Sequence, residues 1–190
     1  VLLGNEVYLF SPFSESGRTH CWNPLDAVSE DPVERIGDID AIAASLYSGS
    51  SEKDRFWSEN AKDLFRGLCL LVLETRGIPH TMGEILRQAS GKGQPLKAHV
   101  KALLERAKRE GHPYSDACRD CLARVLQNSE NTLASILSTF NVPMLIFQNP
   151  RVDAATSSTS PGLELQSVRR RRITIYLGIA PDRLAQARVL

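Results

Sequence analysis

A lysine between two glycines is the nearest approach in this chain to a phosphate-binding loop. Such a loop places Gly-rich backbone before a helix that begins with Lys and then Ser or Thr, so that N–H groups and the ammonium surround a phosphate. The segment Ser90-Gly91-Lys92-Gly93 lacks both the leading Gly and the hydroxyl residue after Lys92. We therefore predict a loop that connects two helices, and we expect no catalytic or cofactor-binding residue in this chain.

Cys118 and Cys121 stand three residues apart, a spacing that suits one half of a zinc site. A structural zinc ion needs four converging ligands, and only His112 lies nearby in the sequence. The alternative is that two small side chains pack on one face of a helix, and we favour it, with no metal expected. Four cysteines in a chain of this length indicate reduced thiols in a cytosolic setting rather than a disulfide scaffold.

The histidines and aromatic residues form no local signature of catalysis or base stacking. No histidine accompanies a nucleophile in a recognisable motif, although a hydrolase triad could still assemble in three dimensions. Phe56 and Trp57 belong to an amphipathic pattern without interleaved basic residues, so we predict that they anchor a core. The histidines are His20, His80, His99 and His112.

Basic residues are concentrated between Lys92 and Arg124, where eight Lys and Arg stand against four Asp and Glu. Lys97, Lys101 and Lys108 share one face of a predicted helix, opposite an apolar stripe. This face is either an ordinary solvated surface or a docking surface for an acidic partner or a nucleic-acid backbone. Arg169-Arg170-Arg171-Arg172 is a denser run, and it either contacts a partner or ends a loop near acidic neighbours.

Composition and charge describe an ordinary globular chain. The 190 residues are 42% hydrophobic and 24% charged, and their formal net charge is +1, so no strong field indicates a nucleic acid or a membrane. The longest apolar run, Leu68 to Leu73, is far shorter than the roughly 20 residues that span a bilayer. Because the chain begins with Val1 and opens directly into a strand pattern, we expect a segment of a longer protein.

The predicted order of elements is a strand, about six helices and a strand. Strands are predicted at residues 6–10 and 173–179, the second of them buried. Helix starts are indicated by Asp31-Pro32, Thr81, Ser115 and Ser129, and a long helix by apolar spacing from about Glu52 to Thr75. Another helix follows Leu96, Pro143 bends or breaks the helix that contains it, and residues 149–167 form a polar linker before a last helix at Pro181. This order predicts a mainly α fold in which a helical bundle is inserted between two strands of one sheet, so the two strands should lie together.

Four segments, taken in order, resemble the coupling ATPases of bacterial conjugation and type IV secretion. They cover almost the whole chain, and one departure stands at Ser158–Pro161, where that family continues with Asp-Phe. The segments are Val7–Pro12 with Asn23–Asp26, Asp54–Trp57 with Ala61 to Leu68, Asn149–Val152 with Ala155–Ser157, and Thr174–Leu177 with Pro181–Leu184.

The resemblance implies an all-α domain at residues 30–148, flanked by remnants of a RecA-like nucleotide-binding sheet at 1–29 and 149–190. The family's phosphate loop would precede Val1 and its acidic metal-binding motif would follow Leu190, so ATP and Mg would belong to the parent protein. That parent would be a hexameric motor anchored in the bacterial inner membrane. This segment would lie on the cytoplasmic side, without direct membrane contact, and would be monomeric in isolation.

By the same resemblance, the all-α domain receives cargo, either protein effectors or a relaxase bound to DNA, and works with other secretion components. We expect a non-enzymatic recruitment module that uses the face of Lys97, Lys101 and Lys108. One alternative is direct DNA binding through the basic residues, as part of a conjugative motor. Another is a structural insertion that spaces subunits in the hexamer.

Overall fold

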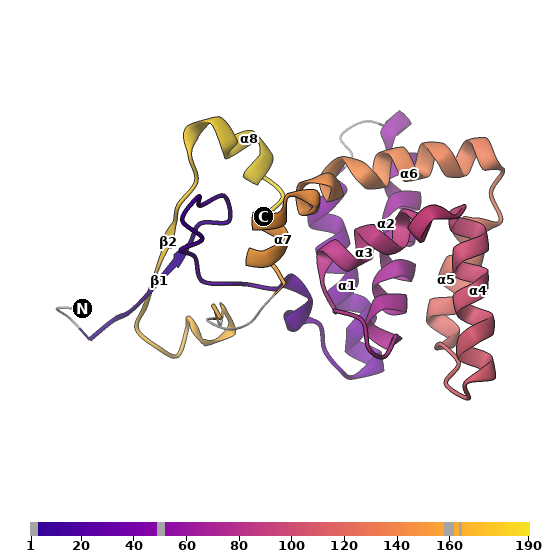
Figure 1. Ribbon diagram of the computed structural model, residues 1–190, viewed down its shortest axis with the longest axis horizontal. Coiled ribbons are helices and arrows are strands. Elements are labelled where there is room, and N and C mark those ends of the chain that lie inside the picture. Colours follow the sequence, from indigo (N-terminus) through magenta and orange to yellow (C-terminus); the bar gives the residue numbers. More distant parts are fainter. Residues whose placement is uncertain (1–3, 49–51, 158–161, 164) are drawn as a thin grey trace.

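The chain folds into a helical bundle with a small sheet at one end, as the computed structural model in Figure 1 shows. The structure describes residues 4–48, 52–157, 162, 163 and 165–190, so the departure at Ser158–Pro161 lies outside the described residues. Helices α1 to α6 form the bundle on the right of the view, and the strands lie on the left. The mainly α fold predicted from the sequence is confirmed.

A long central helix organises the bundle. Helix α2 (Glu52–Glu74) contacts α1 (Pro32–Leu46), α3 (Met82–Ala89), α5 (Asp116–Leu126) and α6 (Glu130–Met144). Its residues Leu64, Phe65, Leu68 and Leu71 are fully buried, because apolar side chains recur at helical spacing along more than one face. The predicted core residue Phe56 is an exception at 53% exposure, since it lies in the first turns of α2, where its neighbours Asp54 and Arg55 are exposed as well.

The predicted helix starts are confirmed by their caps. Asp31 Oδ1 accepts a hydrogen bond from the Val33 N–H at 2.9 Å, and Pro32 takes the first position of α1, where no N–H is needed. The hydroxyls of Thr81, Ser115 and Ser129 cap α3, α5 and α6 in the same way. Helix α4 (Leu96–Arg109) follows the 3-10 turn η2 (Gly91–Gly93).

The segment after α6 is more ordered than the polar linker that we predicted. Helix α6 ends one residue after Pro143 and continues as the 3-10 turn η3 (Leu145–Gln148). Helix α7 (Pro150–Ala155) then begins at the Asn149 cap, and its Val152 is fully buried in the core of the bundle. The Asn-Pro pair is a helix-start signal, but a helix as short as α7 forms only because the bundle covers its few apolar residues.

Two parallel strands complete the structure and confirm that the two end segments meet. Strand β1 (Glu6–Phe10) pairs with β2 (Ile173–Leu177) in a register that places Leu9 beside Tyr176. The prediction of a buried second strand was wrong, because Tyr176 is 60% exposed and Leu177 is 68% exposed. After β2, the chain ends with the turn η5 (Pro181–Arg183) and helix α8 (Leu184–Ala187). Two further 3-10 turns are η1 (Pro24–Ala27), between β1 and α1, and η4 (Leu165–Ser167), before β2.

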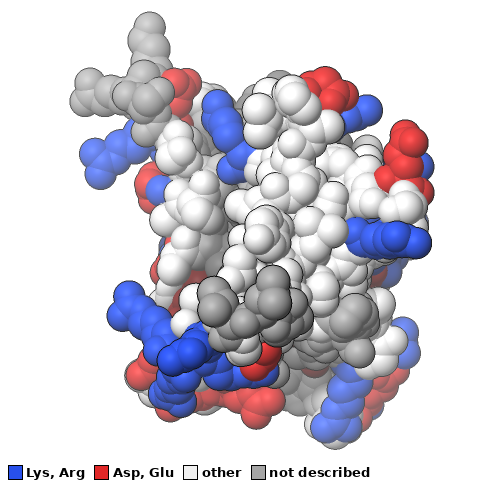
Figure 2. Space-filling view, turned by 90° about the vertical axis from the view of Figure 1, so that its left-hand side faces the viewer, with Lys and Arg blue, Asp and Glu red and all other residues white. Residues whose placement is uncertain are grey.

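The sheet is unfinished within the described part of the chain. Its order is β1-β2, and loop residue His20 bonds the outer edge of β1, with its N–H donating to Leu9 O at 2.7 Å; Thr19 Oγ1 accepts from the Ser11 N–H just after the strand. No described strand pairs with the outer edge of β2. Figure 2 views this end of the molecule and shows uncharged surface running down its middle. An uncovered sheet with an open edge is a surface for further strands.

Candidate docking surface of the helical bundle

The three lysines of the predicted face have different surroundings. Lys97 Nζ donates a hydrogen bond to the Asn128 carbonyl at 2.8 Å and so ties α4 to the end of α5. Lys101 Nζ lies 3.9 Å from Glu105 Oε1, one turn along α4. Lys108 is exposed and has no ion-pair partner among the described residues. The role of the three as a contact face remains a prediction, and Lys108 is the member whose charge is available.

Most other cations of α4 and α5 are paired with carboxylates. Arg106 Nε donates to Glu110 Oε1 at 2.7 Å, and Arg124 Nη1 lies 3.2 Å from Asp63 Oδ2. Arg119 pairs with Asp116. These exposed pairs contribute little to stability, and among the described residues they leave Lys108 and Arg109, at the end of α4, without an ion-pair partner. The face is therefore better suited to a local contact than to a continuous phosphate track.

A small pocket lies beside that free end. Leu104, Pro113 and Tyr114 supply apolar surface, and Lys108 and Arg119 supply positive charge, around a volume of about 290 Å³. Tyr114 is buried, and its hydroxyl lies 2.8 Å from Thr75 Oγ1, so the ring is held against α2. Neither Pro113 nor Tyr114 carries a binding signal in the sequence. Their contribution depends on the turn after Gly111, which brings them back against α4.

A larger groove of about 610 Å³ runs between α3, α6, η3 and α7. Leu86, Leu137 and Leu145 line it, together with polar side chains, and Leu145 is 49% exposed. Two further lining residues form an ion pair, with Arg87 Nη1 3.0 Å from Asp153 Oδ2. This pair neutralises both charged residues of the lining, so the groove carries no net charge.

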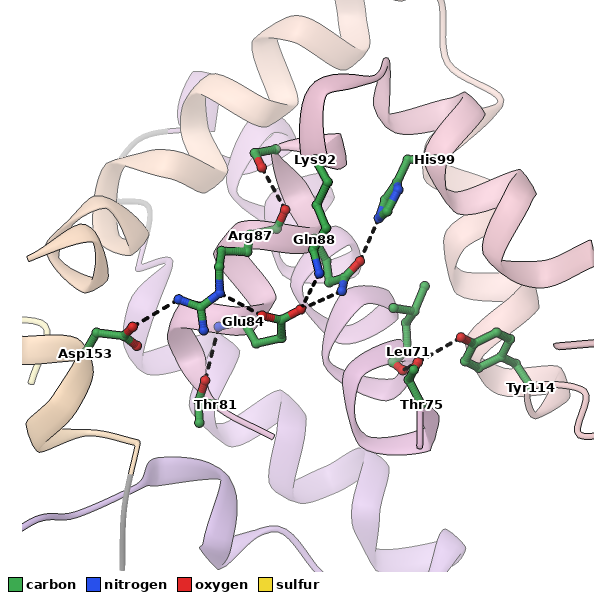
Figure 3. A network of polar contacts seen from close by, with 11 residues as sticks. Leu71, Thr75, Thr81, Glu84, Arg87, Gln88, Lys92, His99, Tyr114 and Asp153 are labelled. Carbon is green, nitrogen blue, oxygen red and sulfur yellow. Dashed lines mark hydrogen bonds and ion pairs between the residues drawn. The ribbon is translucent and has the colours of Figure 1, made fainter. Parts of the chain in front are cut away.

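The Gly-Lys-Gly segment serves the bundle, as predicted for a loop that connects helices. Figure 3 shows Lys92 pointing into a polar network around Glu84, to which its Nζ donates at 2.8 Å. Lys92 has a φ of 48°, a left-handed conformation that is uncommon for a residue with a side chain. The bond to a buried carboxylate compensates for that conformation, and it occupies the ammonium that a phosphate would need.

Glu84 is the centre of this network and is almost fully buried. Its carboxylate accepts hydrogen bonds from Arg87 Nε at 2.7 Å, Gln88 Nε2 at 2.7 Å and Lys92 Nζ at 2.8 Å. Burial alone would raise the pKa of Glu84, but the three hydrogen bonds and the Lys92 charge outweigh it, so the pKa lies below its ordinary value. The carboxylate is therefore ionised at neutral pH and joins α3 to the loop before α4.

His99 extends the network to α4. Its Nε2 lies 2.6 Å from Gln88 Oε1, and because the Gln88 amide nitrogen donates to Glu84, that ring nitrogen is the donor. Burial lowers the pKa of His99, the Lys92 charge lowers it further, and the Glu84 charge opposes both. Neutral His99 thus connects two helices by one hydrogen bond.

The cysteine pair packs in the core, as we favoured. Cys118 and Cys121 lie against α2, where their Sγ atoms donate to the carbonyls of Gly67 at 3.7 Å and Asp63 at 3.3 Å. Burial raises the pKa of both thiols, which keeps them protonated. Within residues 4–48, 52–157, 162, 163 and 165–190, no three His, Cys, Asp or Glu side chains are placed to hold a metal ion.

The arginine run before β2 is bonded to β1, since the Arg172 carbonyl accepts from the Glu6 N–H at 2.8 Å and the Arg171 side chain contacts the Glu6 carboxylate. Arg171 Nε donates to Glu6 Oε1 at 2.9 Å, and this bond from Arg171 is the main reason that the pKa of Glu6 lies below its ordinary value. Arg169, Arg170 and Arg172 are exposed. The interpretation of this run as a loop end beside an acidic neighbour therefore holds for Arg171.

Among the helices that the structure describes, none combines the length and the apolar composition that a membrane span requires.

Comparison with known proteins identifies the family. The chain matches the family described as "Type IV secretory system Conjugative DNA transfer" over residues 3–190. It is 28% identical over 183 residues to protein VirD4 of Agrobacterium fabrum, which covers 95% of this chain and 26% of that protein. It is also 22% identical over 193 residues to the conjugal transfer protein TraG of Escherichia coli, which covers 98% of this chain and 30% of that protein. The chain spans about a quarter of the length of the VirD4 relatives that it matches. The chain belongs to the conjugative DNA transfer family of type IV secretion coupling proteins, as the resemblance of its sequence motifs predicted.

Proposed function

We propose that this chain is the cargo-receiving helical domain of a type IV secretion coupling ATPase, with short parts of the nucleotide-binding sheet at both ends. The observation that carries the proposal is the contrast between a helical bundle with its own closed core and a sheet of only two described strands. The bundle has a closed core around α2, whereas in the described part of the chain β2 has an open edge and both strands expose apolar side chains. A domain inserted into a larger sheet has this arrangement.

The exposed side of the sheet supports the same proposal. In a parallel pair, residues in register point to the same side, so Val7, Leu9 and Tyr176 share one face. They are 48%, 37% and 60% exposed. On the opposite face, His20 packs against Tyr8 and Trp22 against the buried Phe10, while Leu177 at the end of β2 is 68% exposed. Parallel sheets are nearly always covered on both faces. The parent protein would supply the missing strands and helices, together with the sites for ATP and Mg, the membrane anchor and the hexamer contacts.

Cargo docking on the bundle is the biochemical role that we assign to this segment. The 610 Å³ groove and the Lys108 end of α4 are surfaces that the bundle does not use for its own packing. We propose that the cargo is a protein, either an effector or a relaxase. The pairing of most of these cations with carboxylates favours a protein over a DNA backbone, because phosphate binding gains from releasing many counterions at once.

An NMR titration tests the proposal. The secretion-signal domain of a cargo protein from the same secretion system is added to the isotopically labelled chain, and shifts are expected among residues 31–147. A parallel titration with single- and double-stranded DNA should give only weak, salt-sensitive binding. Unchanged spectra with cargo would refute the docking role. Tight DNA binding that weakens steeply with salt would instead establish the DNA-binding alternative.

A further inference from the structure

We propose that the pocket between α4 and α5 is the point at which the bundle recognises an acidic, leucine-bearing peptide segment of its partner. This inference rests on the proposed docking function and names the chemistry of the docked segment. The pocket is formed by Leu104, Lys108, Pro113, Tyr114 and Arg119. It combines an apolar floor with two cations at its rim.

The floor is rigid and of a size for one aliphatic side chain. Tyr114 is 7% exposed, and its hydroxyl is held by Thr75 Oγ1 at 2.8 Å, so its ring cannot turn away. Pro113 has a fixed backbone, and Leu104 is half-buried against the core. The volume of about 290 Å³ accommodates a leucine but not a folded element. A preformed pocket of this kind binds without a large ordering cost in the protein.

The rim selects negative charge. The side-chain ammonium of Lys108 has no ion-pair or hydrogen-bond partner within the described residues, so it is free to bind a carboxylate. Arg119 gives one nitrogen, Nη2, to Asp116, and the rest of its guanidinium remains for a second carboxylate. Gly111, with a φ of 75°, follows the end of α4, and its N–H donates to the Lys108 carbonyl. The Lys108 carbonyl beside the pocket therefore already has a hydrogen-bond donor. Charge complementarity therefore commits the occupant to an acidic segment.

The test uses a short fluorescent peptide that contains leucines and glutamates, bound to the chain and followed by anisotropy. Two matched peptides carry glutamine or lysine in place of each glutamate. The acidic peptide is expected to bind more tightly than either control, and Lys108→Glu should weaken it roughly fivefold or more, since exposed ion pairs contribute modestly. Arg18→Glu, an equal charge change on an exposed loop residue, should have no effect.

The outcomes separate this inference from the proposed function. NMR shifts induced by the acidic peptide should centre on Leu104, Lys108 and Tyr114, and Lys108→Glu should keep the urea midpoint of the wild type because Lys108 is exposed. Equal binding of the three peptides, or of wild type and Lys108→Glu, overturns the inference. A cargo domain that binds Lys108→Glu as tightly as wild type also overturns it, yet leaves the docking function standing. A cargo domain that binds neither form refutes the docking function itself.

Discussion

Replacing Glu84 with glutamine should destabilise the bundle more than any single exposed charge change. The Glu84 side chain is 5% exposed, whereas the side chains of its two cationic partners, Arg87 and Lys92, are each 45% exposed. Glutamine keeps the size of the side chain and one acceptor oxygen, but it removes the charge and turns an N–H₂ group towards the cations. The folded state loses charge-assisted hydrogen bonds and retains the left-handed conformation of Lys92.

The expected cost follows from the burial of the partners. Removing one member of a fully buried ion pair costs about 3–5 kcal/mol, because the other charge is left buried. Here both cations can regain water, so we expect the lower range of about 2–3 kcal/mol, near the contribution of one charged hydrogen bond. For a chain of this size, that corresponds to a melting temperature lower by about 5–10 °C.

Urea unfolding followed by circular dichroism measures the effect. With a urea slope of about 2 kcal/mol per molar, the midpoint should fall by about 1–1.5 M. Glu105→Gln is the matched control, since Glu105 is 63% exposed and 3.9 Å from its lysine, and it should change stability by less than about 0.5 kcal/mol.

The pH dependence gives a second reading of the same residue. Because the folded-state pKa of Glu84 is lowered from 4.5, its stabilisation is complete above that pH and is lost as the pH falls through the folded value. The difference between wild type and Glu84→Gln should therefore shrink in acid. A loss below about 0.5 kcal/mol at neutral pH would show that water already hydrates the network, and the reasoning would fail.

Three further predictions concern packing, titration and the open sheet. Gly67→Ala places a Cβ 2.9 Å from Leu122 Cδ2 and should destabilise the fold by about 1–2 kcal/mol, whereas Gly37→Ala, with nothing within 4 Å, should stabilise it by up to about 1 kcal/mol. Shifts of the denaturant midpoint in the same direction for both variants would contradict this. Because the pKa of His99 is lowered from 6.5 in the folded state, its stabilisation is complete above pH 6.5 and is lost as the pH falls through the folded-state pKa. His99→Gln should therefore flatten the dependence of the unfolding free energy on pH in this range, and parallel curves for variant and wild type would refute the prediction. Tyr176→Thr should reduce self-association in light scattering at nearly constant stability, and a loss above about 1 kcal/mol would show that the tyrosine is buried in solution.

The helices were predictable wherever a local signal and a long apolar pattern agreed. Asp31, Thr81 and Ser115 each cap a helix as predicted, because a capping hydrogen bond involves neighbours only two or three residues away. Helix α7 was missed, since its stability comes from Val152 entering a core built by other helices. The exposure of Phe56 was missed for the converse reason, because its apolar spacing says nothing of whether a partner covers it.

The candidate site was predictable only in part. Charge counting found the basic helix that carries Lys108, but it could not show that Lys97 bonds the Asn128 carbonyl. The pairing of a cation depends on which acidic side chain or carbonyl the fold brings near it. Tyr114 and Pro113 gave no signal of their own, because an apolar floor forms only where a turn places them against α4.

By itself, the sequence determined the order of elements, the helix caps and the family, since each depends on residues that are close together along the chain or on ordered motifs. Only the tertiary structure decided that β1 and β2 pair in parallel over a separation of well over a hundred residues and that Glu84 binds two cations. It also decided that the Lys108 ammonium lies beside a pocket without a partner in the part of the chain that the structure describes. These features depend on contacts between distant segments, whose geometry is set by how the whole core packs rather than by any local pattern.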